Sequence, residues 1–112
     1  MSRRMIRIND EIKEQVAMLI RNLKDPRLSS LITVVRADTT QDLKYCKVYI
    51  SIMGTKEEKE NTLLALKSAA SFIKKELAKS VNLRQTPQIS FILDESLDYA
   101  MRIDEILKEV NQ

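Results

Sequence analysis

The sequence predicts an α+β fold in which helices pack on a three-stranded sheet, in the order α-β-β-α-α-β with a further C-terminal helix. Three observations support this prediction. Apolar residues recur at helical spacing near the start, two β-branched runs flank a polar turn, and a long lysine-rich helical segment precedes a third alternating run. With 112 residues and 44% hydrophobic content, the chain can bury one core without disulfides or metals.

The first helix is predicted from apolar residues that recur three or four positions apart. They are Ile12, Val16, Leu19, Ile20 and Leu23. We expect Asn9 or Asp10 to cap or charge its first turn. Because Pro26 disfavours helical backbone at the preceding residue, the helix should end at about Asp25.

Two strands are predicted next, joined as a hairpin. The run from Leu31 to Thr39 is rich in β-branched residues, and the run from Tyr45 to Met53 alternates between apolar and polar positions. The intervening TQDLK supplies turn-forming residues, so an antiparallel hairpin is the simplest connection. Cys46 falls on the apolar face, where we expect a small buried thiol rather than a reactive one.

A long helical segment should follow Gly54, which ends the second strand. Thr55 and Glu58 fit a capping box at its start. If it ran straight to Lys79 it would be about 36 Å long, well beyond the roughly 20 Å of a six-residue strand. We therefore expect it to kink or divide, with least steric cost at its small residues: Ala69, Ala70 and Ser71.

This segment is amphipathic. Its apolar stripe contains Leu63, Leu66, Ala70, Ile73 and Leu77. The opposite side contains Lys67, Ser71, Lys74, Lys75 and Lys79. Lysines so placed can contact nucleic-acid phosphates, but on these residues alone an ordinary solvated helix face is favoured.

The third strand is predicted from the alternation of Ile89, Phe91 and Leu93, and Pro87 can only begin it or lie at an edge. Ser96 would cap the last helix. We expect residues 1–112 to form one domain, with about 95–112 as a C-terminal helical tail.

Composition excludes several classes of function. The chain has no histidine, which removes the commonest general base and metal ligand. With one glycine, it contains no P-loop, no dinucleotide fingerprint and no GxxG loop. It also has no apolar run long enough to span a bilayer and no secretory signal pattern. We expect a soluble cytoplasmic protein that needs no cofactor or metal.

Charge is distributed unevenly along the chain. Residues 67–87 contain five basic residues against one acidic, whereas residues 88–112 contain two against six. Residues 1–27 contain seven against four. A basic surface and an acidic tail are both consistent with this pattern.

Several motifs, in this order and spacing, resemble the ribosome-binding factor A family, whose members are bacterial proteins of about this length that assist maturation of the small ribosomal subunit. The matching segments are DPRL at 25–28, DLKYCKVYIS at 42–51, Gly54, AAS at 69–71 and LRQTPQISFILD at 83–94. The sequence departs from the family pattern at three positions. Ser71 replaces the usual glycine, Cys46 an alanine, and Gln88 a glutamate.

The resemblance implies a type II KH-like RNA-binding domain in which an alanine-centred helix kink replaces the GxxG loop. It also implies binding to the immature 30S subunit near the ends of its 16S rRNA, without RNA cleavage. Aid to 5′-end maturation, growth in the cold and release by a ribosome-associated GTPase are further properties of that family. We expect a monomer.

The resemblance favours an RNA-contact role for the lysine face. The candidate residues are Lys67, Lys74, Lys75, Lys79 and Arg84, with Arg3, Arg4, Arg7 and Arg27 as possible extensions. For Arg3 and Arg4, a role limited to keeping the first helix soluble explains the sequence equally well. Of the aromatic residues, we expect Phe72 and Phe91 in the core, while Tyr45 and Tyr49 are stacking candidates that more often serve packing.

Two other classes of function stay open. The acidic segment Gln88–Gln112 could dock on a basic protein partner, with RNA incidental. Alternatively, carboxylates such as Asp94 and Glu95 could hydrolyse RNA ends with a divalent metal, although no second acidic cluster accompanies them. A charged cap on the last helix explains them adequately.

Overall fold

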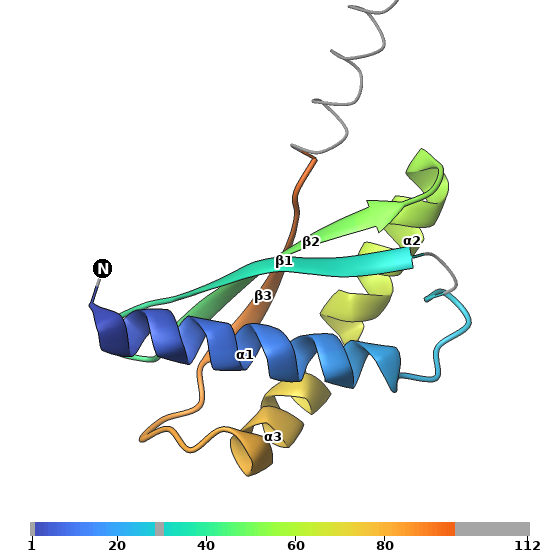
Figure 1. Ribbon diagram of the computed structural model, residues 1–112. Coiled ribbons are helices and arrows are strands. Elements are labelled where there is room, and N and C mark those ends of the chain that lie inside the picture. Colours follow the sequence, from blue (N-terminus) through green and yellow to red (C-terminus); the bar gives the residue numbers. More distant parts are fainter. Residues whose placement is uncertain (1, 29–30, 96–112) are drawn as a thin grey trace, which may run out of the picture.

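The computed structural model describes residues 2–28 and 31–95. Its elements are α1 (Arg3–Arg21), β1 (Leu31–Thr39), β2 (Tyr45–Met53), α2 (Lys56–Ser68), α3 (Ala70–Ser80) and β3 (Gln88–Leu93) (Figure 1). This order confirms the α+β, KH-like arrangement, with both hairpin strands at their expected bounds. The expected C-terminal helix lies outside the described residues.

The sheet has the order β1-β2-β3, which places β2 at its centre. The hairpin strands β1 and β2 are antiparallel, with a register shift between Val34 and Arg36. β3 lies parallel to β2, with Gln88 beside Tyr45 and Leu93 beside Ile50. Among the described strands β3 pairs only with β2, so its outer edge has no partner strand.

The helices cover one face of this sheet. Figure 1 shows α1 running beneath β1, with α3 below it, and α1 contacts both β1 and α3, while α3 also contacts β3. Alternate residues of β2, from Cys46 to Ile52, are buried under this layer. Phe91 of β3 is buried in the same cluster, as expected.

α1 differs from the prediction at both ends. It begins six residues before Asn9, because the hydroxyl of Ser2 accepts the backbone N–H of Met5 at 3.2 Å and so caps the helix. The expectation of a first turn at Asn9 or Asp10 was therefore wrong. Asn9 is instead buried in mid-helix, where its Oδ1 accepts the backbone N–H of Thr39 at 3.0 Å.

The end of α1 comes at Arg21 rather than near Asp25. Pro26 sets a limit on the helix but does not determine where it stops. Residues 25–28 form a turn of their own, in which the carbonyl of Asp25 accepts the N–H of Leu28 at 2.9 Å. Because the carboxylate of Asp25 also accepts the N–H of Arg27, this turn competes with a longer helix.

The start of α2 confirms the capping box. The hydroxyl of Thr55 accepts the N–H of Glu58 at 3.1 Å, and the Glu58 carboxylate accepts the N–H of Thr55. Gly54 precedes it with φ +150°, and a Cβ there would lie 2.8 Å from the Glu58 carboxylate. Glycine is therefore required both by its backbone conformation and by the cap beside it.

The long helical segment divides where its residues are smallest. Ala69 separates α2 from α3, with φ −89° and ψ −2°, and its N–H still reaches the carbonyl of Ala65 at 3.0 Å. This division confirms the expectation that the segment would kink or divide. Across residues 2–28 and 31–95 the positive φ angles belong to Leu43 and Gly54, so Ser71 does not adopt a conformation that needs glycine.

Phe72 was expected in the core, and this prediction was wrong. Its side chain is 51% exposed. Ile73 and Leu77, which lie one turn apart on α3, are fully buried and occupy the side that faces the sheet. Phe72 lies about 100° around the helix from Ile73, so both cannot face the core.

Candidate nucleic-acid interface

A groove runs between the helical kink and the free edge of β3. We call it the kink groove. It encloses about 500 Å³ and is lined by Lys67, Ala70 and Ser71 from the helices and by residues 88–91 of β3. The small side chains at 70 and 71 keep the helical wall low. The β3 wall is a strand edge that no other described strand pairs with, so its backbone donors and acceptors face outward.

The helical wall of this groove contains a helix start and one cation. α3 begins here, and Ala69 at its N-cap makes no side-chain capping bond. A helix N-terminus presents partial positive charge, which the end of α2 at Ser68 partly offsets, and Lys67 adds a full charge beside it. Backbone N–H groups at a helix start are suited to phosphate oxygens. The groove can therefore hold a phosphate-bearing chain.

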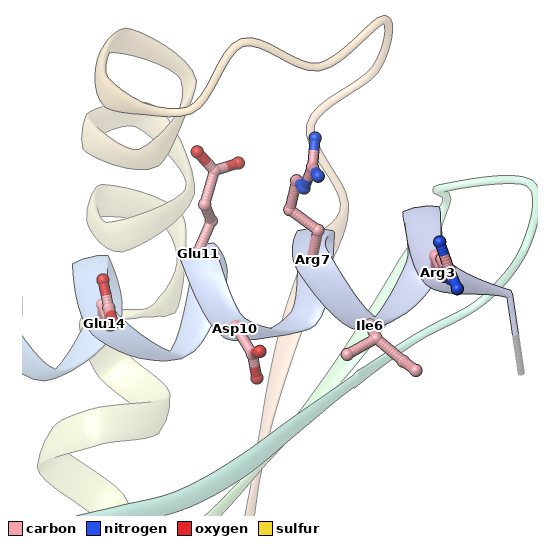
Figure 2. Close-up of a pocket in the computed structure, with 6 residues that line it drawn as sticks. All are labelled: Arg3, Ile6, Arg7, Asp10, Glu11 and Glu14. Carbon is pink, nitrogen blue, oxygen red and sulfur yellow. The ribbon is translucent and has the colours of Figure 1, made fainter.

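A second basic site forms where α1 starts. Arg3, Arg4 and Arg7 of α1 and Arg84 of the α3–β3 loop line one hollow of about 420 Å³, together with Ile8, Glu11, Asn82 and Leu83. We call it the arginine hollow. Figure 2 shows Arg7 and Glu11 projecting from the same side of α1 toward that loop. One carboxylate among four guanidinium groups leaves a strong net positive charge, and arginine suits bidentate phosphate contacts.

The outer side of α1 has a different character. A shallow hollow of about 450 Å³ there is lined by Arg3, Ile6, Arg7, Asp10, Glu11 and Glu14 (Figure 2). Three carboxylates oppose two guanidinium groups, so phosphate binding is less favourable than in the arginine hollow. In the part of the chain that the structure describes, no group of three or more acidic or cysteine side chains is placed to hold a metal ion.

The lysines of α3 lie between these two sites along the chain. Lys74 and Lys75 are exposed. Lys79 is also exposed, but its Nζ lies 3.1 Å from the Glu76 carboxylate, so part of its charge is neutralised. α3 has 11 residues and is about 16 Å long, so the basic groups extend from the kink groove toward the loop that carries Arg84.

Comparisons with known proteins identify the family of this chain. The family model for ribosome-binding factor A matches residues 4–107. The chain belongs to the ribosome-binding factor A family. A relative of that name from Clostridium botulinum (strain Loch Maree / Type A3) is 47% identical over 107 residues, covering 95% of this chain and 89% of the relative.

A solved structure and a fitted homology model of family members have the same fold. The crystal structure of ribosome-binding factor A from Thermus thermophilus matches with a TM-score of 0.73 and 27% identity, over 82% of this chain and 97% of that one. A homology model of the Thermus thermophilus factor, fitted into the cryo-EM map of a 30S complex, matches with a TM-score of 0.64 and 29% identity. It covers 78% of this chain and 91% of that one.

Arg27 is the candidate that stands apart from the others. It lies beyond the C-terminal end of α1, which has 19 residues and separates it from Arg3 by about 28 Å. Its guanidinium contacts the Asp25 carboxylate at 2.8 Å, and hydrogen bonds from Arg27 lower the pKa of Asp25. Its carbonyl accepts the buried hydroxyl of Thr62 at 3.2 Å, so Arg27 also ties this loop to α2.

The sequence did not indicate several residues that line the candidate interface. Gln88 and Ser90 line the kink groove, and Asn82 lines the arginine hollow. The alternation of β3 could have placed the first two on its polar face, but no sequence signal showed that this edge borders the kink. The exposure of Phe72, beside the kink, could have been predicted from the sequence, because this residue lies about 100° around the helix axis from Ile73.

Cys46 is buried, and this burial raises the pKa of its thiol. A raised pKa keeps the sulfur protonated near neutral pH, and the thiolate is the nucleophilic form.

Within residues 2–28 and 31–95, no helix is both long enough and apolar enough to cross a membrane.

Proposed function

We propose that this protein binds the immature 30S ribosomal subunit through its 16S rRNA and assists late maturation, including processing of the rRNA 5′ end, without cleaving RNA itself. The observation that carries the proposal is the arginine hollow, where segments about 75 residues apart in the chain bring four guanidinium groups together. A relative fitted into the map of its 30S complex supports the same partner.

Binding would proceed mainly through phosphates. At one end of the basic surface, the RNA backbone would be bound by Arg3, Arg4, Arg7 and Arg84. In the kink groove, it would be bound by the start of α3 together with Lys67. Lys74 and Lys75 would contact phosphates between them. The exposed ring of Phe72 would add an apolar or stacking contact.

Recognition would depend on the shape of folded rRNA. The chain lacks a GxxG loop, so it would not clamp four nucleotides as KH domains with that loop do. Cationic side chains read no base identity, and their specificity comes from the spacing of phosphates that a folded RNA presents.

The protein would act as a cytoplasmic monomer, supporting growth in the cold, and a ribosome-associated GTPase would release it.

The test is co-sedimentation of the purified protein with immature and mature small subunits over a salt series. If about four phosphates are neutralised, affinity should fall with salt at a log–log slope of roughly −3. Loss of salt dependence would contradict phosphate binding. Binding that survives RNase digestion of the complex would instead assign the interaction to a protein partner.

Matched charge variants locate the contact. The double variants Lys74→Glu with Lys75→Glu and Arg7→Glu with Arg84→Glu should each weaken binding roughly tenfold or more, since each replaces two phosphate contacts by repulsion. The control is Lys24→Glu with Lys56→Glu, which makes the same charge change at exposed lysines elsewhere. Equal weakening by the control would reject a localised interface.

A further inference from the structure

The face of the sheet opposite the helices carries an ordered row of side chains, which we call the open face. Tyr45, Lys47 and Tyr49 alternate along β2 with the buried residues and therefore point to this face. No helix of the described part of the chain covers it. Tyr45 is 56% exposed, as a stacking candidate requires.

A guanidinium lies over an aromatic ring at one end of this row. The Cζ of Arg36, on β1, lies 3.9 Å from the centroid of the Tyr49 ring, as expected for a cation–π contact. Arg36 itself remains exposed. One face of its guanidinium is therefore occupied by the ring, and the other is available for a further planar group.

The open face is also net positive around the tyrosine. Lys44 and Lys47 flank Tyr45 in sequence, and Arg36 adds a third cation. Asp38 lies opposite Lys47 in the β1–β2 register, and Asp42, in the turn before β2, interacts with Lys44. Three cations against two carboxylates leave a small positive balance, which favours a polyanion over a neutral partner.

The open face is continuous with the kink groove across β3. Gln88 lies beside Tyr45, and Ser90 lies beside Lys47. Neighbouring strands are about 4.8 Å apart. Gln88 and Ser90 also line the kink groove, so both are shared by the two surfaces. Both are neutral, and a phosphate chain crossing the β3 edge between the surfaces would meet no carboxylate among the groove-lining residues.

We propose that a single-stranded RNA segment leaving the kink groove crosses the edge of β3 and stacks one base on the ring of Tyr45. Lys47 contacts an adjacent phosphate, and the free side of the Arg36 guanidinium accepts a second base about 13 Å along β2. The inference rests on the proposed function, because it extends the same RNA path onto the other face of the sheet.

The test compares a uridine octanucleotide with a ribose-phosphate chain of eight units that lacks bases. Fluorescence anisotropy gives the affinity of the full-length protein for each. The wild type should prefer the base-bearing chain about fivefold, the lower end of base–aromatic stacking. Tyr45→Leu should lower the preference at least twofold, because only the base contact at Arg36 and any contact at Phe72 remain, and Tyr45→Phe should retain the full preference. Leucine keeps apolar bulk on the strand, so the variant should stay folded, as circular dichroism will check.

Two controls separate stacking from charge and from general effects on the face. Met53→Ala changes an exposed residue at the far end of β2 and should leave the preference unchanged. The Lys74→Glu, Lys75→Glu variant should weaken both chains equally, because phosphates are common to both.

A preference in folded Tyr45→Leu that stays within twofold of the wild-type value would overturn the stacking site. So would wild-type protein that shows no preference or binds neither chain. If 30S binding remains salt-sensitive and dependent on the lysines in those cases, the proposed function stands and only the open-face site fails. If 30S binding is itself absent, the proposed function fails.

Discussion

The two central helices begin in opposite ways. α2 starts with a complete capping box, in which Thr55 and Glu58 exchange hydrogen bonds between side chain and backbone. Glu57 adds a second carboxylate in the same first turn. α3 starts at Ala69 with no side-chain cap and no acidic residue in its first turn. The two starts also differ in burial, since Thr55 and Lys56 are exposed, whereas Ala69 and Ala70 are partly buried against the core.

The capped start of α2 serves the stability of the fold, whereas the uncapped start of α3 is available for binding. Side chains of the protein satisfy the start of α2 and stabilise it against unfolding. The start of α3 borders the kink groove, where a carboxylate cap would repel the phosphate that we assign to it. Small neutral residues there leave positive potential available to a ligand.

The largest expected effect comes from placing an acid at the start of α3. Ser71→Glu should weaken binding to the small subunit roughly tenfold or more, because the carboxylate occupies the phosphate position and pairs with Lys75 four residues on. The same change should raise the free energy of unfolding by about 0.5 kcal/mol, since it favours the helix dipole. Co-sedimentation and urea unfolding measure the two effects.

The decisive result would be that Ser71→Glu raises the free energy of unfolding and at the same time weakens binding to the small subunit. Ser71→Gln, which matches the size of the glutamate but is neutral, should bind at least threefold more tightly than Ser71→Glu, because the two variants differ only in the charge at the helix start. If Ser71→Glu binds as tightly as the wild type, no phosphate lies at the start of α3.

The sequence predicted these helices well because the determinants are local. The capping box is encoded within four residues, and the division at Ala69 follows from helix length and side-chain size. Phe72 was misplaced because its apolar character was given more weight than its helical phase. The start of α1 was misplaced because Asn9, a frequent capping residue, instead bonds to Thr39 across the core.

The candidate site was harder to predict than the fold. The lysine face could be plotted from helical periodicity, but the arginine hollow depends on the α3–β3 loop returning to the start of α1. No periodic pattern encodes that contact between distant segments. The same limitation applies to Gln88 and Ser90, which acquire their position from the parallel pairing of β3 with β2.

A moderate effect is expected from removing the cap of α2. Thr55→Ala deletes the hydroxyl that accepts the N–H of Glu58 at 3.1 Å and should lower the free energy of unfolding by about 1 kcal/mol. Affinity of the folded protein for the small subunit should not change, since α2 separates this cap from the kink groove by about 20 Å. Urea unfolding and co-sedimentation at low temperature measure both quantities.

Thr55→Ser retains a capping hydroxyl and should behave like the wild type, which tests that the lost bond causes the effect. A fall in affinity of folded Thr55→Ala would show that the start of α2 also contributes to binding. The contrast between the two helix starts would then be wrong.

The smallest effect is expected from Ser71→Gly, which restores the residue usual in the family pattern. Ser71 already lies within α3 without a positive φ angle, so the kink shown here does not need the conformational freedom of glycine. The free energy of unfolding should fall by less than about 1 kcal/mol, and affinity should stay within about twofold of the wild type. Affinity that rises about fivefold or more would mean that RNA selects a sharper kink than the free protein adopts, because glycine would then lower the cost of reaching it. In that case the start of α3 would be a site that RNA reshapes, whereas unchanged affinity would support a groove already formed for its ligand.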